Sequence, residues 1–145
     1  MKHPRWLLAL GAAFFSFSYT ALAASSLVYV GTYTDRELLV PRRANAPGER
    51  SKGIYAFRFD QETGRLTSLG LAAEAANPTY ITFAPSGKFL YATNEIYQFN
   101  GAPSGAVSAF SLDPATGRLA LLNQESAHGT GTCHASVDSA GRRLF

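Results

Sequence analysis

The sequence lacks the features that mark disulfide-rich, zinc-binding or nucleic-acid-binding proteins. Its one cysteine, Cys133, has no partner for an internal disulfide. The formal net charge of +3 includes Lys2 and Arg5, and without them 11 basic residues face 10 acidic ones. Such a nearly neutral chain is not expected to bind nucleic acid. The patterns Gly-x-Ser-x-Gly, His-x-x-x-His and Cys-x-x-Cys are also absent, so a serine triad and a metal site lack support.

The first 23 residues have the pattern of a secretory signal peptide. A basic start at Lys2 and Arg5 precedes the uncharged apolar run Leu7–Phe17, and Ala21-Leu-Ala23 is a small-residue cleavage site. The alternative is a membrane anchor, but the run is short for a span of about 20 residues. No later segment has the length and apolar character of a membrane helix, so we expect no membrane contact after cleavage. An exported chain without disulfides is expected to be secreted or periplasmic, after cleavage behind Ala23.

A repeat organises the rest of the chain. Residues 53–69 return as residues 106–122, and residues 83–91 return 54 positions later as residues 137–145. In the first pair eight residues recur unchanged after 53 positions: Ala56, Phe57, Asp60, Thr63, Gly64, Arg65, Leu66 and Leu69. A period near 50 that consists of short strands and turns is typical of propeller blades. We therefore predict an all-β fold made of four-stranded antiparallel blades.

Apolar and β-branched runs between Gly, Pro and Asp residues predict the strands. They cover Leu27–Thr34, Gly53–Phe59, Arg65–Ala72, Thr79–Phe83, Phe89–Asn94, Gly105–Leu112, Arg118–Asn123 and His134–Val137, with another starting at Arg143. The segments Asp60–Gly64 and Asp113–Gly117 are predicted hairpin turns. One complete blade is expected at about residues 77–123, after a three-stranded partial blade and before the start of a third. Residues 24–145 would then be the N-terminal two to three blades of a larger propeller, inactive and prone to aggregate alone.

This topology predicts which residues share one rim of the propeller. Antiparallel strands bring the start of a blade's first strand and the end of its second strand to the same side. Thr32–Thr34, Asn77–Tyr80, Asn94-Glu95 and Cys133-His134 should therefore gather around the channel mouth. His134 is the candidate general base, since histidine exchanges protons near neutral pH. Glu95 is a candidate base or the group that orients His134.

Other residues near this rim are candidates for substrate binding. Asn77 and Tyr80 lie on it, and Arg42 and Arg43 belong to a basic loop that would clamp an anionic substrate. For each candidate a structural or solvated role is the alternative. Cys133 precedes His134, and neighbours on a strand point to opposite faces, so Cys133 is expected to be a small buried residue.

The chain resembles the lactonases with a seven-bladed β-propeller, which include propeller-type 6-phosphogluconolactonases and 3-carboxymuconate lactonising enzymes. The segments that carry the resemblance are Tyr29-Val-Gly-Thr-Tyr-Thr34, Ser51–Tyr55, Asn77–Glu95, Gly105–Leu122 and Cys133–Asp138. The resemblance implies hydrolysis of a small sugar lactone without a cofactor, with His134 and Glu95 matching family positions in the cleft. Two alternatives stay open: a non-catalytic propeller that binds a ligand or protein at this rim, and a muconate-type cycloisomerase.

Overall fold

The computed structural model describes residues 25–34 and 50–145, and these residues form seven strands and no helix. The strands are β1 (Ser25–Gly31), β2 (Gly53–Asp60), β3 (Leu66–Glu74), β4 (Pro78–Phe83), β5 (Phe89–Asn94), β6 (Ala106–Leu112) and β7 (Leu119–Ser126). The predicted signal peptide and the basic loop with Arg42 and Arg43 lie outside the described residues. Within the described ranges, no helix has the length and apolar character needed to cross a membrane.

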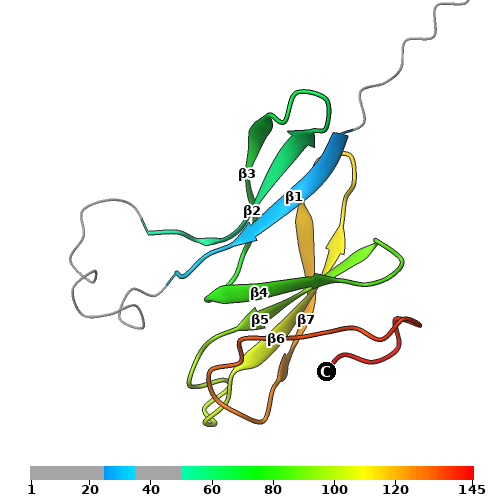
Figure 1. The fold of residues 1–145 in the computed structure, drawn as a ribbon. Coiled ribbons are helices and arrows are strands. Elements are labelled where there is room, and N and C mark those ends of the chain that lie inside the picture. Colours follow the sequence, from blue (N-terminus) through cyan, green and yellow to red (C-terminus); the bar gives the residue numbers. More distant parts are fainter. Residues whose placement is uncertain (1–24, 35–49) are drawn as a thin grey trace, which may run out of the picture.

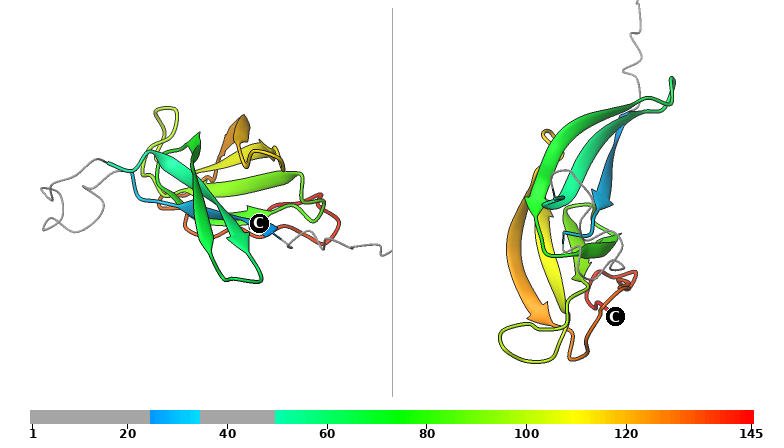
Figure 2. Two further views of the ribbon diagram at one scale, coloured as in Figure 1. Left: turned by 90° about the horizontal axis from the view of Figure 1, so that it is seen from above. Right: turned by 90° about the vertical axis from the view of Figure 1, so that its left-hand side faces the viewer.

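The strands form two antiparallel sheets, shown in Figure 1. A three-stranded sheet has the order β1-β2-β3, and a four-stranded sheet has the order β4-β5-β6-β7. Every strand therefore pairs with its neighbour in the sequence, which gives each sheet the simple meander of a propeller blade. This arrangement confirms the predicted complete blade at residues 77–123 and the partial blade before it. Figure 2 shows that both sheets are twisted.

The start of a third blade is less regular than predicted. No strand forms at His134–Val137, and Val137 pairs with Leu144 only in an isolated bridge. The Ser136 and Phe145 peptides exchange two hydrogen bonds, of 2.9 and 2.8 Å. In this register Ser136 faces Phe145, and among the described residues His134 pairs with no strand. The predicted pairing is present, but the predicted strand at His134 is wrong.

The two Asp-x-x-x-Gly segments form the predicted hairpin turns. The Asp60 and Asp113 N–H groups donate to the carbonyl five residues on, at 2.9 and 3.0 Å. Gly64 and Gly117 donate back to those aspartate carbonyls, at 2.9 and 2.8 Å. The φ angles of the two glycines are 70° and 75°, which a side chain disfavours. The repeat therefore specifies the turns as well as the strands.

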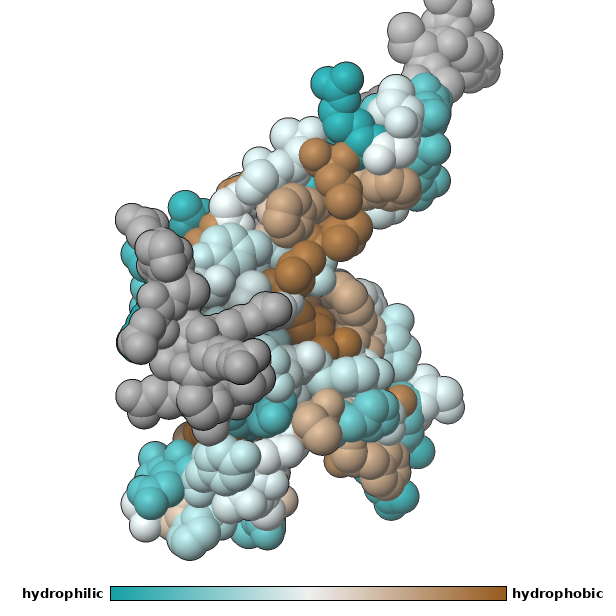
Figure 3. All heavy atoms as spheres, turned by 60° about the vertical axis from the view of Figure 1, so that its left-hand side comes forward, coloured by the Kyte–Doolittle hydropathy of each residue, from teal (hydrophilic) through white to brown (hydrophobic). Residues whose placement is uncertain are grey.

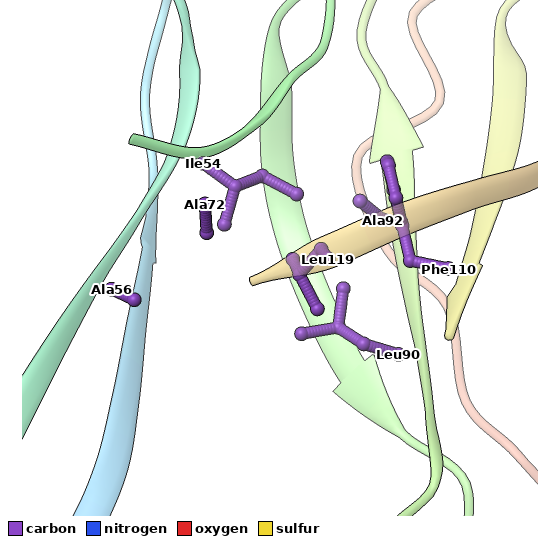
Figure 4. Packing of buried hydrophobic residues seen from close by; sticks show 7 residues of the cluster. All are labelled: Ile54, Ala56, Ala72, Leu90, Ala92, Phe110 and Leu119. Atoms are coloured by element: carbon purple, nitrogen blue, oxygen red, sulfur yellow. The ribbon is translucent and has the colours of Figure 1, made fainter. Parts of the chain in front are cut away.

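The core lies between the two sheets and contains residues of both. Figure 4 shows its buried members, which are Ile54, Ala56, Ala72, Leu90, Ala92, Phe110 and Leu119. Phe110, Ile54 and Leu90 are fully buried, and each contributes about 1.5–3 kcal/mol by leaving water. Ala56, Ala72 and Ala92 have small side chains, which lets the two sheets lie close together. The backbones also approach closely at Gly31 of β1, where an added Cβ would lie 1.9 Å from the Pro78 carbonyl oxygen of β4. The two blades thus pack face to face with no space for larger residues at Gly31.

Other large apolar side chains of the described part remain exposed. Leu66, Leu121 and Leu122 are each about half exposed, and Phe145 is 72% exposed. Figure 3 shows apolar residues gathered in a band across the face turned to the viewer. Repeat proteins bury such surfaces by stacking one unit on the next. These side chains are therefore suited to contact with further protein surface.

Candidate rim site

Asn77 joins the three segments that meet at the predicted rim. Its Oδ1 accepts hydrogen bonds from the Thr34 N–H and hydroxyl, at 2.9 and 3.2 Å. Its Nδ2 donates to the Glu95 carbonyl at 3.1 Å, and the Glu95 N–H donates to the Asn77 carbonyl at 3.0 Å. Asn77 has a φ of 41°, which asparagine tolerates better than most residues. The loop after β1, the start of β4 and the end of β5 are thus held together.

A chain of buried polar groups fixes the end of β5 across its sheet. Asn94 Nδ2 donates to the Ala76 carbonyl at 2.6 Å, and Asn94 Oδ1 accepts from the Ser108 hydroxyl at 2.6 Å. The Ser108 oxygen in turn accepts from Gln124 Nε2 at 2.8 Å. Asn94 and Ser108 are fully buried, and buried polar groups are stable when they are paired in this way. Glu95, the next residue, therefore extends from a rigid position.

The carboxylate of Glu95 contacts Tyr33, which lies in the predicted rim segment Thr32–Thr34 but is not one of the predicted site residues. The Tyr33 hydroxyl donates to Glu95 Oε2 at 2.7 Å. This hydrogen bond raises the pKa of Tyr33 above its ordinary value of 10.0, and partial burial and the Glu95 charge add to the effect. Among the described residues no hydrogen bond links Glu95 to His134. Orientation of His134 by Glu95 thus stays a prediction without a direct contact.

His134 lies against Tyr80 on the same rim. The two ring centroids are 4.4 Å apart and the ring planes are inclined by 47°. Tyr80 is 37% exposed, and the side chain of His134 is also exposed. The Tyr80 N–H donates to the Thr93 hydroxyl at 3.2 Å, which ties β4 to β5 beside the ring pair. His134 is therefore accessible to a solute and has one face supported by Tyr80.

Two of the side-chain contacts at the rim, Tyr33 with Glu95 and Tyr80 with His134, join equivalent positions of consecutive repeats. The repeat aligns Tyr80 with His134, and the alignment of Val28-Tyr29 with Leu90-Tyr91 places Tyr33 opposite Glu95. Both of these pairs are in contact in the structure. In both pairs, equivalent residues of neighbouring blades thus lie side by side at the rim. That alignment was the signal that could have identified Tyr33.

The structure brings together some predicted site residues and changes the setting of others. Asn77 is 1% exposed and its amide bonds to protein groups, which gives it a positioning role, while direct contact with substrate stays a prediction. Arg42 and Arg43 lie outside the described residues. Cys133 is an exposed free thiol, so the expectation of a buried cysteine is wrong. The segment that carries it forms no strand, and no sheet face covers it.

The rim is an open surface in the part of the chain that the structure describes. Those residues enclose no pocket. They also hold no cluster of three or more His, Cys, Asp or Glu residues that could bind a metal ion. Two neighbouring blades form one sector of a ring, so they cannot surround a channel by themselves. The chemistry available on this sector is that of His134, Glu95 and the two tyrosines.

Residues 27–145 match the family described as Lactonase, 7-bladed beta-propeller. The chain belongs to this family of propeller lactonases, which confirms the resemblance and the fold. The 6-phosphogluconolactonase of Bacillus subtilis is 36% identical over 110 residues, which are 76% of this chain and 26% of that protein. The 6-phosphogluconolactonase of Formosa agariphila is 26% identical over 81% of this chain and 29% of its own length.

The solved structure of the Pseudomonas aeruginosa periplasmic gluconolactonase is also similar. It has a TM-score of 0.66 and 31% sequence identity, over 84% of this chain and 30% of that protein. The chain thus spans between a quarter and a third of the length of these relatives. The residues matched here correspond to one part of a ring of seven blades.

Proposed function

We propose that this chain supplies the His134–Glu95 sector of a sugar-lactone hydrolase of the 6-phosphogluconolactonase type. The observation that carries the proposal is the meeting of an accessible histidine, a carboxylate and two tyrosines at one rim of a propeller-lactonase chain. Relatives of the chain are named as 6-phosphogluconolactonases and as a periplasmic gluconolactonase. Hydrolysis of a lactone requires water, a base and stabilisation of an oxyanion, and it requires no cofactor.

In this mechanism the unprotonated His134 ring removes a proton from water as the water oxygen attacks the lactone carbonyl. The carbonyl becomes a tetrahedral oxyanion, for which backbone N–H groups or the Arg42 and Arg43 side chains are the candidate donors. Collapse of this intermediate breaks the ring C–O bond, and the imidazolium returns its proton to the departing ring oxygen. Glu95 would accept a hydrogen bond from the substrate or the attacking water. The product is the open-chain hydroxy acid.

We expect an unphosphorylated lactone to be the preferred substrate. Residues 1–23 have the pattern of a signal peptide, and one structural relative is named as periplasmic. An exported enzyme would not meet a phosphorylated intracellular metabolite. Arg42 and Arg43 are nevertheless suited to bind anionic groups. Their replacement by alanine should raise KM more for a phosphorylated lactone than for a neutral one.

The test is the rate of acid release from D-glucono-1,5-lactone and from 6-phosphogluconolactone, corrected for spontaneous hydrolysis. It uses the 145-residue chain and a graft in which residues 25–145 replace the matching part of the Pseudomonas aeruginosa protein. The graft supplies the other blades, so activity in the graft with inactivity of the chain alone would confirm the expected dependence on them. Inactivity of a folded graft on both lactones would refute the proposed function.

Two histidine variants test the assigned base. His134→Asn should lower kcat/KM of the graft by about 100-fold or more, the usual scale for loss of a general base. His128→Asn is the matched control, because His128 is exposed and its backbone N–H, which the substitution keeps, donates to the Ser126 hydroxyl oxygen. Its φ of 56° is one that asparagine tolerates. If His134→Asn hydrolyses lactone as fast as His128→Asn, His134 is not the base. A non-catalytic binding role for this rim would then replace the enzymatic one.

A further inference from the structure

Glu95 is held both at its backbone and at its side chain. The Glu95 N–H donates to the Asn77 carbonyl at 3.0 Å, and the Glu95 carbonyl accepts from Asn77 Nδ2 at 3.1 Å, so the peptide cannot move freely. Its side-chain Oε2 accepts from the Tyr33 hydroxyl at 2.7 Å. A free glutamate side chain has several rotamers of similar energy, and a bond to one oxygen removes most of them.

The two oxygens of this carboxylate have different surroundings. Among the described residues no hydrogen bond reaches Glu95 Oε1, whereas Oε2 is occupied by Tyr33. The Tyr33–Glu95 distance of 2.7 Å is typical of a well-formed O–H···O hydrogen bond. One oxygen therefore anchors the group and the other keeps its lone pairs for a solute.

We infer that Tyr33 is a positioning residue that holds the Glu95 carboxylate at the rim and leaves Oε1 to bind a substrate hydroxyl or the attacking water. This inference rests on the proposed lactonase function. Tyr33 itself would not touch the substrate and would act through Glu95. The partner of Oε1 is thus a hydroxyl-rich, uncharged ring, because a phosphate group near Glu95 would be repelled by its charge.

The surroundings of Tyr33 agree with this role. The titratable groups that influence it are Glu95 and Tyr97, which follow β5, and Cys133 of a second segment. None of these three groups is a cation that could pair with the Glu95 carboxylate. The donor to that carboxylate in this group is therefore the neutral Tyr33 hydroxyl. Removal of that hydroxyl would leave Oε2 without its described partner.

The experiment compares single and double variants in the 145-residue chain and in the graft. Tyr33→Phe should lower kcat/KM for D-glucono-1,5-lactone by about tenfold, the scale of one hydrogen bond to a charged group. Tyr91→Phe is the matched control, since Tyr91 lies within β5 and its hydroxyl has no hydrogen bond to a described residue. Glu95→Gln should cost more than Tyr33→Phe. The double variant should be no slower than Glu95→Gln alone, because Tyr33 acts through the carboxylate.

A second measurement decides the inference without activity. In the wild-type chain, Tyr33 should ionise above its ordinary pKa of 10.0, and Glu95→Gln should move this titration back toward 10.0. The titration is followed by NMR on the Tyr33 ring signals, which are assigned by their absence from the spectrum of Tyr33→Phe. Two results would overturn the inference. One is a loss of kcat/KM in the double variant that equals the product of the two single losses, and the other is a Tyr33 pKa that does not change in Glu95→Gln. If Glu95→Gln keeps the wild-type rate while the titration still shifts, Glu95 has no part in catalysis and the positioning role falls with it. If wild-type chain and graft are both inactive, the proposed function fails, and the titration alone still tests whether Tyr33 holds Glu95.

Discussion

The contact between the two blades at Gly31 leads to a sharp prediction about stability. In Gly31→Ala the new Cβ would lie 1.9 Å from the Pro78 carbonyl oxygen and 3.0 Å from the carbonyl carbon. Ordinary contacts of this kind begin at 3.4 Å, so the two backbones must separate by more than 1 Å. The obstacle is backbone, which cannot rotate away as a side chain would. The variant must therefore move β1 relative to β4 or lose their contact.

The cost follows from overpacking and from the neighbouring hydrogen bonds. Extra methyl groups in a packed core typically cost about 1–3 kcal/mol. Pro78 follows Asn77, whose bonds to Thr34 and Glu95 would be strained by the same displacement. We expect a loss of about 3 kcal/mol in the free energy of unfolding, a large part of the 5–15 kcal/mol typical of a domain. For a unit of about 100 residues this corresponds to a fall in Tm of roughly 15 °C.

The control for this experiment is Gly129→Ala. A Cβ on Gly129 meets no atom within 4 Å, and its φ lies outside the left-handed region. This exposed substitution should change stability by less than about 0.5 kcal/mol. Urea unfolding followed by circular dichroism, at a concentration where sedimentation shows one species, gives both values. If the free energies of unfolding of Gly31→Ala and Gly129→Ala agree within a few tenths of a kcal/mol, β1 and β4 do not approach each other as closely as described.

Three further predictions concern acid stability, association and export. Hydrogen bonds lower the pKa of Asp113 below its ordinary value of 3.8, and the largest contribution comes from the Thr116 hydroxyl. The ionised Asp113 carboxylate therefore stabilises the fold above about pH 4, and this stabilisation is lost as the pH falls further. Asp113→Asn should lower Tm at pH 7 and weaken the acid dependence of Tm below about pH 4. The chain alone should associate as its concentration rises, and lysine at Leu121 and Leu122 should reduce this in sedimentation, because both are exposed. N-terminal sequencing of the exported protein should show cleavage after Ala23, and an intact N-terminus would contradict the predicted signal peptide.

Many features of this protein could be read from local sequence. Alternating strands and Asp-to-Gly turns depend on neighbouring residues, and a repeat displays them twice. The strand predicted at Phe89–Asn94 has the observed bounds, and the other six strands lie within a few residues of their predicted positions. The same repeat placed Tyr80 and His134 at equivalent sites, which the structure shows in contact.

The contacts of the rim depended instead on how the blades pack. The repeat places Tyr33 and Glu95 on the same rim although they are 62 positions apart, but the contact between their side chains depends on how the two blades pack. Cys133 was expected to be buried on a strand, but its segment has no partner and stays exposed. The sequence by itself determined the strands, the turns and the propeller fold, because these depend on local patterns. The tertiary structure decided which side chain holds Glu95 and what covers each rim residue, because those contacts join segments far apart in the chain.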